Sequence, residues 1–236
     1  MKKIIGLTLG VSLLLLSGCN SLLPGKVKEE DILVEKDKAK ELEVDINLGA
    51  GELILENGAK DWVEGNAEYN NKKLAPDVKY DLHGDTGEVV IEHKGSTNIG
   101  VTNIKNKWDI NLNEDIPMDL SISTGASVAN LNLQGLILNK LNIETGVGDL
   151  DVDLGGDWKK GFKTNIETGV GSTTVILPSE VGVIITSEKG IASSNFEGFV
   201  SKGNGVFVND AYENADVVLE VNAEIGVGEV SFKLDK

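Results

Sequence analysis

The sequence predicts an all-β fold, a right-handed parallel β-helix-like ladder of short strands with Gly-x-Gly corners. The first observation is an exact repeat: Asn142–Gly148 returns letter for letter as Asn165–Gly171, 23 residues later. A segment that recurs at such a period is typical of stacked supersecondary units. The second observation is an apolar alternation with period two around each glycine pair, which is typical of a strand with one buried face. An antiparallel β-sandwich is the alternative fold.

Looser copies of the repeat extend it along the chain. In one of them, Glu188 stands where the first glycine is expected and Gly190 takes the place of the second. From Gly125 onward, the copies follow one another closely enough to predict a tandem array, and one further copy around Gly49 stands apart in the sequence. The glycines expected at the corners are Gly49, Gly51, Gly125, Gly146, Gly148, Gly169, Gly171, Gly190, Gly226 and Gly228.

The glycine pairs are expected to turn the chain because the alternation changes phase across them. Leu141, Ile143, Thr145 and Val147 alternate up to the corner of one copy, and Leu150, Val152 and Leu154 alternate after it. A slip of one residue would turn the wrong face inward unless the backbone bends there, and glycine permits such a bend. One isoleucine in each copy is then expected to join a single internal column, formed by Ile46, Ile122, Ile143, Ile166 and Ile185.

Residues 1–18 are interpreted as a lipoprotein signal peptide. Lys2 and Lys3 precede an apolar run from Ile4 to Leu16, whose 13 residues are too few to span a bilayer. Leu16-Ser17-Gly18-Cys19 resembles the lipobox of bacterial lipoproteins. This resemblance implies that the Cys19 sulfur receives a diacylglyceryl group and that the chain is cut just before Cys19. Because Cys19 is the only cysteine, the chain cannot form an internal disulfide.

The anchor implies a localisation outside the cytoplasm, with the membrane as a partner through the Cys19 lipid. Two acyl chains give stable anchoring, whereas one binds only marginally. Residues 19–30 contain turn formers and mixed charge and are interpreted as a tether. The abundance of lysine and asparagine together with the absence of arginine suggests a Gram-positive source of low GC content.

Residues 31–115 are expected to form an N-terminal β region, and residues 116–236 the C-terminal repeat ladder. The strands expected in the first region are Leu42–Leu55, Trp62–Tyr69, Asp77–His83, Glu88–His93 and Trp108–Leu112. Gly84–Gly87 is interpreted as a hairpin turn, and Pro76 and Pro117 as strand edges. In the second region, Trp158, Phe162 and Phe196 are expected to plug the core or the corners.

The charge of the chain excludes nucleic acid as a partner. The sequence has 22 basic residues, none of them arginine, against 38 acidic ones, which gives a net charge of −16 at pH 7. Such a surface repels phosphate and attracts cations or basic proteins.

Taken together, the lipobox, the short strands and the repeated Ile-x-Thr-Gly-x-Gly corners resemble the toast-rack family of bacterial proteins. That family is related to the putative-adhesin and LiaF-like C-terminal β-ladder domains. The resemblance covers roughly residues 35–236, and it implies a stacked β-ladder and a link to adhesion or to envelope stress. It implies no functional residue.

Several residues are candidates for sites of chemistry. Asp149, Asp151 and Asp153 are candidates for a Ca²⁺ site, but the positions after the second exact copy are not acidic, so a solvated face is preferred. His83 and His93 lie on strands that are expected to pair, and a surface location is preferred to a metal site. Gly146-Val147-Gly148 lacks the third glycine and the lysine of a phosphate loop.

No catalytic constellation stands out in the sequence. We therefore expect a non-catalytic binding or scaffold module at the cell envelope, without a cofactor, whose partner is an envelope protein or a polysaccharide. Two alternatives remain open. One is an enzyme that acts on polysaccharide, which would need two positioned acids in a cleft, and the other is a Ca²⁺-binding surface protein.

Overall fold

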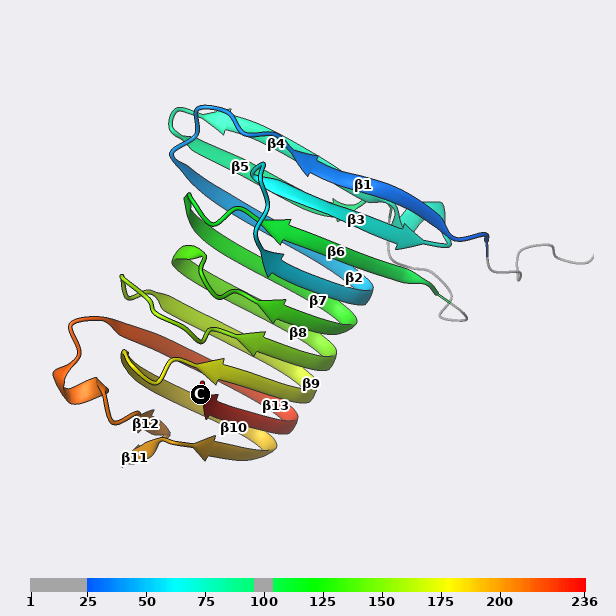
Figure 1. The fold of residues 1–236 in the computed structure, drawn as a ribbon. Helices are drawn as coiled ribbons and strands as arrows, with labels where there is room; N and C mark the ends of the chain where they lie inside the picture. The colour runs from blue at the N-terminus through cyan, green and yellow to red at the C-terminus, as the bar shows by residue number, and fades with distance from the viewer. Residues whose placement is uncertain (1–24, 96–103) are drawn as a thin grey trace, which may run out of the picture.

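The computed structural model describes residues 25–95 and 104–236 (Figure 1). The predicted lipobox residues Leu16, Ser17 and Gly18 and the lipidation site Cys19 lie outside these ranges. The first strands are β1 (Lys28–Val34), β2 (Glu41–Asn57), β3 (Val63–Tyr69), β4 (Pro76–His83), β5 (Thr86–His93) and β6 (Asn106–Leu112). The later strands are β7 (Pro117–Asn132), β8 (Ile137–Asp153), β9 (Lys163–Leu177), β10 (Gly182–Glu197), β11 (Val200–Gly203), β12 (Val206–Val208) and β13 (Val218–Leu234). Two short 3-10 helices, η1 (Lys72–Leu74) and η2 (Tyr212–Asn214), complete the described residues.

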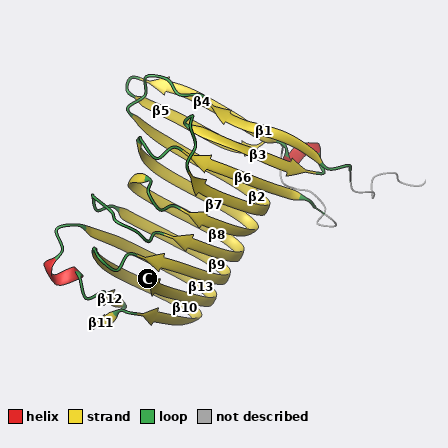
Figure 2. Cartoon of the chain, viewed as in Figure 1, coloured by secondary structure: helices red, strands yellow, loops and turns green. Residues whose placement is uncertain are grey.

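Most of the described structure is strand, and the remainder is almost entirely loop, as Figure 2 shows. Within the part of the chain that the structure describes, no helix has the length and apolar character needed to cross a membrane.

Six long strands stack in parallel, in the spatial order β2-β7-β8-β9-β13-β10. Each of them bends midway, so that its two arms face each other across a core (Figure 1). The predicted parallel ladder is therefore confirmed, although the sheet stays open at its two ends. Antiparallel pairing is limited to the strands around the ends of the ladder, namely β1–β3, β3–β6, β4–β5, β10–β12 and β11–β12.

The two exact copies of the repeat lie side by side in register. Asn142 is paired with Asn165, and Gly148 with Gly171, so that the first copy in β8 lies in register with the second copy in β9. The copy around Gly49, although distant in sequence, stacks directly on the array because β2 pairs with β7 through both arms. The sheet thus runs without a break across the boundary expected near residues 114–117.

The second glycine of a corner supplies the left-handed backbone that the bend requires. Gly171 has a φ of 149°, and a Cβ at this position would lie 1.7 Å from the carbonyl oxygen of Gly148 in the neighbouring rung. The first glycine is needed for a different reason: a Cβ on Gly146 would lie 2.6 Å from the carbonyl oxygen of Gly125. Both glycines therefore allow the rungs to approach closely, and the first also leaves its own position on the outer face without a side chain.

The isoleucine column is confirmed for four of its five members. Ile46, Ile122, Ile143 and Ile166 are paired rung by rung, and each is at most 1% exposed. Ile185 is also buried, but it is paired with Val221 and so belongs to the neighbouring column. The prediction for this residue was wrong by two positions, because Gly190 occupies the place of the first glycine, opposite Gly226, and not that of the second.

The order of the rungs differs from the order of the sequence. The C-terminal strand β13 lies between β9 and β10, so the last copy of the repeat is not at the end of the ladder. The connection from Leu177 to Gly182 can reach about 17 Å when extended, whereas two rung spacings combined with the gap of about 10 Å between facing arms need about 14 Å. The connection can therefore skip one rung, and the end of the ladder is formed by β10 with the β11–β12 hairpin.

Two further expectations need correction. Val147 does not continue the buried alternation: it is 54% exposed because it lies on the outside of the bend. The first strand begins at Lys28, inside the segment interpreted as a tether, and pairs with β3.

Other expectations hold. Pro76 and Pro117 each begin a strand, and a turn at Gly84 and Asp85 joins β4 to β5. Trp158 and Phe162 are buried, with ring centroids 4.7 Å apart, so they plug the core as expected. Phe196 stacks on Phe207 and Phe232.

Candidate functional site

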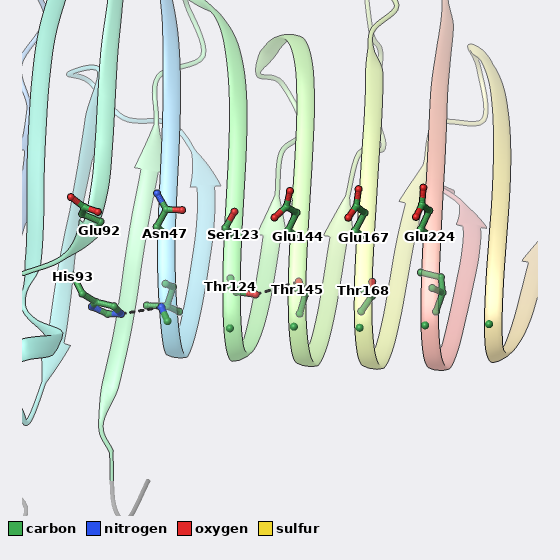
Figure 3. Close-up of a pocket in the computed structure, with 18 of the residues that line it drawn as sticks. Asn47, Glu92, His93, Ser123, Thr124, Glu144, Thr145, Glu167, Thr168 and Glu224 are labelled. Atoms are coloured by element: carbon green, nitrogen blue, oxygen red, sulfur yellow. Dashed lines mark hydrogen bonds between the residues drawn. The ribbon is translucent and has the colours of Figure 1, made fainter. Parts of the chain in front are cut away.

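An open groove of about 1020 Å³ crosses all six rungs of the ladder, on the outer face of the first arms and next to the corners. Rungs in a sheet are about 4.8 Å apart, so the groove extends for about 24 Å. Its lining consists of three rows of residues that run at right angles to the strands (Figure 3). We call it the ladder groove.

The first row is the floor of first glycines. It consists of Gly49, Gly125, Gly146, Gly169, Gly226 and Gly190. Because these residues lack side chains, the backbone of each rung is exposed along the groove. This floor is a direct consequence of the close stacking that the repeat imposes.

The second row, the glutamate row, runs along one side of the glycine floor. Glu144, Glu167, Glu224 and Glu188 are paired in succession on β8, β9, β13 and β10, and all four are exposed. The row continues toward the N-terminal end as Ser123 on β7 and Asn47 on β2. Figure 3 shows Glu144, Glu167 and Glu224 side by side on the same face.

Like charges on neighbouring strands are unfavourable. A cross-strand charged pair changes stability by about 0.2–1 kcal/mol, and the sign is destabilising for two carboxylates. None of these four glutamates forms an ion pair or a hydrogen bond within the part of the chain that the structure describes. The ladder therefore carries an uncompensated row of negative charge along its groove.

A third row of threonines lies under the groove, on the core side of the strands. Thr124, Thr145 and Thr168 are 3–7% exposed. The hydroxyl of Thr124 donates to that of Thr145 over 3.2 Å, and the hydroxyls of Thr168 and Thr173 lie 3.1 Å apart. Both bonds satisfy buried polar groups. The first joins β7 to β8, whereas the second links the two arms of β9.

Beside the glutamate row, on the side away from the glycines, runs an amide ladder. Nδ2 of Asn165 donates to Oδ1 of Asn142 over 2.9 Å, and Nδ2 of Asn222 donates to Oδ1 of Asn165 over 3.1 Å. Stacked asparagines of this kind stabilise in-register parallel strands. They also leave unused amide groups on the outer face, next to the glutamates.

His93 and Glu92, from the end of β5, close the N-terminal end of the groove. The expectation of a surface histidine is wrong for His93, which is partly buried and packs edge-on against Trp108 at 4.9 Å. Burial lowers the pKa of His93, and this effect outweighs the opposite effect of its hydrogen bond to Leu74.

The structure does not bring the candidate metal ligands together. Asp149, Asp151 and Asp153 alternate along one strand, about 7 Å apart, and their neighbours on β9 are Ser172, Thr174 and Ile176. His83 and His93 lie at opposite ends of the β4–β5 hairpin, because His83 is paired with Thr86 and His93 with Pro76. Within residues 25–95 and 104–236, no three acidic, histidine or cysteine side chains converge on a point.

The acids of the groove are also unlike those of a polysaccharide-cleaving site. The general acid of such an enzyme has a pKa raised by its surroundings. The glutamate row is exposed, and none of the described aspartates or glutamates is buried. Among the described residues, the observation that would favour the enzyme alternative is thus missing.

Sequence reasoning missed the ladder groove, although its signal is present in the repeat. Glu144 and Glu167 occupy the same place in the two exact copies, and Glu224 has that place in the last copy. Glu188 completes the row, but assigning it to a glycine position concealed this.

A known structure shares this architecture. A putative cell adhesion protein from Clostridium sporogenes has 34% identity and a TM-score of 0.84, with 89% of this chain and all of that chain covered. A putative adhesin from Bacteroides fragilis has 12% identity and a TM-score of 0.37, with 89% and 98% covered. A putative adhesin from Parabacteroides distasonis has 12% identity and a TM-score of 0.27, with the same coverage. Similarity as low as that of the last two supports no inference about function.

Sequence families give a direct result. No curated protein matches the chain. Residues 23–176, more than half of the chain, match the family described as the N-terminal domain of toast_rack, DUF2154. The match spans β1 to β9 and includes both exact copies of the repeat. The chain therefore belongs to the toast-rack family.

Proposed function

We propose that this protein is a non-catalytic binding protein of the cell envelope, which holds an extended, positively charged chain in the ladder groove. The observation that carries the proposal is the glutamate row, four uncompensated carboxylates in register on one side of a continuous groove. The Clostridium sporogenes relative, named as a putative cell adhesion protein, supports a binding role.

The shape of the groove favours an extended ligand over a compact one. It is long, open and shallow, and its floor of exposed glycine backbone offers no enclosed pocket. The nearly flat floor and the regular rung spacing suit a polymer with a repeating unit, and the adjacent amide ladder adds hydrogen-bonding groups. A ligand with cationic groups would relieve the repulsion within the glutamate row, so part of the binding free energy is already stored in the unbound protein.

Binding of a decalysine peptide tests this proposal by calorimetry at low ionic strength. The double variant Glu167→Gln/Glu224→Gln removes two central carboxylates of the row. Exposed ion pairs contribute about 0.2–1 kcal/mol each, so we expect affinity to fall by about 2- to 30-fold.

The matched control is Glu180→Gln/Glu229→Gln, which makes the same change in net charge at exposed residues away from the groove. This control should retain the affinity of the unmodified protein. An equal loss in both double variants would mean that the peptide senses only the overall charge, and the groove would then not be the binding site.

We also propose that the protein is held at the outer face of the membrane by a lipid on Cys19. The lipobox resemblance supports this proposal. In a Gram-positive host, Cys19→Ser should move the protein from the membrane fraction to the culture medium or leave it unprocessed. Mass spectrometry of the membrane-bound form should find a diacylglyceryl group on its N-terminal cysteine. Unchanged membrane retention of Cys19→Ser would contradict the lipid anchor.

A further inference from the structure

Among the residues that the structure describes, no strand is paired with the first corner of the ladder on its outer side. β5 is paired with the first arm of β2 only as far as Ile46, and β6 is paired with the second arm only from Glu52 onward. The corner between them, residues 47–51, would expose its backbone groups at this edge. At the other rungs of the N-terminal half, the same groups face the next corner.

Two side chains take the place of the missing strand. Nε2 of His93 accepts a hydrogen bond from the backbone N–H of Gly49 over 3.1 Å. Nδ2 of Asn106 donates to the carbonyl oxygen of Ala50 over 2.6 Å. The first corner is therefore capped by an imidazole and an amide that come from different strands.

The contacts of His93 require a neutral ring with its proton on Nδ1. Nδ1 lies 3.1 Å from the carbonyl oxygen of Leu74, which can only accept, so this nitrogen must carry a proton. The N–H of Gly49 can only donate, so Nε2 must be unprotonated. Adding a second proton to the ring would place two donors face to face at Gly49.

Within the described part of the chain, the carboxylates nearest the ring, Asp77 and Glu92, are both paired with Lys79 and are not free to compensate for such a proton. The charged groups around His93 are Glu92 on β5 and Lys94 just after it, Asp77 and Lys79 on the paired strand β4, Lys72 and Lys73 on η1, and Lys107 and Asp109 on β6. Glu92 is paired with Lys79, and Lys94 with Glu30. The corner of β2, residues 47–51, contains no titratable group.

We propose that His93 is an acid-sensitive cap on the first corner of the ladder, and that protonation of its ring uncaps Gly49 at the end of the ladder groove. The device is independent of any ligand of the groove. In the neutral protein the ring seals the corner and covers Trp108, which is fully buried. When the ring is protonated, it rotates into solvent and its hydrogen bond to Gly49 is lost. The backbone at the N-terminal end of the ladder groove then becomes less ordered.

The direction of the pH dependence follows from the burial of the ring. The pKa of His93 in the folded protein is lowered, whereas an unfolded histidine titrates near ~6.5. The contribution of the cap to stability is thus complete above about pH 6.5 and is lost as the pH falls toward the lowered pKa.

An NMR titration of the full-length protein from about pH 8 to pH 5 tests the proposal, because only two histidines contribute ring signals. We expect the His93 ring to titrate below about pH 6.5, and the amide signal of Gly49 to shift in step with it. The hydrogen-exchange protection factor of Gly49 should fall relative to that of Ile143 in the middle of the ladder.

Two variants separate the cap from the general effects of acid. His93→Gln should remove the coupled shift of Gly49, and His83→Gln, at the exposed far end of the hairpin, should preserve it. If His93→Gln does not fold, the titration of the unmodified protein still decides. A His93 ring that titrates at or above about pH 6.5, or a Gly49 amide that ignores its titration, would overturn the proposal.

Discussion

Gly171→Ala is expected to cost more than about 4 kcal/mol of the free energy of unfolding, a loss that few single substitutions reach. The residue has a φ of 149°, and its new Cβ would lie 1.7 Å from the backbone oxygen of Gly148. A backbone atom of a central rung cannot move aside without separating β8 from β9. Chemical denaturation of the variant, followed by circular dichroism, measures the loss.

Gly58→Ala is the matched control for this substitution. Gly58 also has a positive φ, 97°, but no atom lies within 4 Å of the position of a new Cβ. The Gly58→Ala variant should lose about 1–2 kcal/mol of the free energy of unfolding, which is the cost of a left-handed conformation for alanine. If the two variants lost the same amount, the contact between rungs would not be what demands the glycine.

Ile143→Ala is expected to cost about 2–5 kcal/mol, the usual range for emptying a buried isoleucine site. Its side chain is 1% exposed and is stacked between Ile122 and Ile166, so the surrounding column is too regular to collapse into the space. The thermal unfolding midpoint and the denaturant midpoint should both fall.

Val147→Ala serves as the comparison for this prediction. It removes apolar atoms four residues further along the same strand, but from a side chain that is 54% exposed at the outside of the bend. Its effect should stay within about 0.5 kcal/mol, as for most surface positions. A large loss of stability in Val147→Ala would mean that Val147 is buried and that the burial pattern assigned to the corner is wrong.

The sequence was sufficient to predict the repeating part of this fold. The change of phase at Gly146 and Gly148 has only one good physical solution, a bend with one face kept inward, and the exact copies determine the register of β8 on β9. The register of β10 was not predictable in the same way. Its corner keeps only Gly190 of the glycine pair, and Glu188 fits either the outward glutamate row or a damaged glycine position.

Features that depend on how separate segments pack against one another could not be predicted from the sequence. Equal spacing of the copies fits any order of stacking, so the insertion of β13 between β9 and β10 left no signal. The cap on the first corner was hidden for a similar reason. It depends on the place where the β4–β5 hairpin ends against β2, and no local pattern around His93 records that contact.

The insertion of β13 between β9 and β10 affects how the protein can fold during its synthesis. A solenoid whose rungs stack in the order of the sequence can fold one rung at a time as each segment is synthesised. Here the layer that precedes the end of the ladder is made last, since β10 finds its parallel neighbour only in residues 218–234. Assembly of this end must therefore wait until residues 218–234 have been made, and until then β10 lacks its parallel neighbour and is prone to non-native contacts.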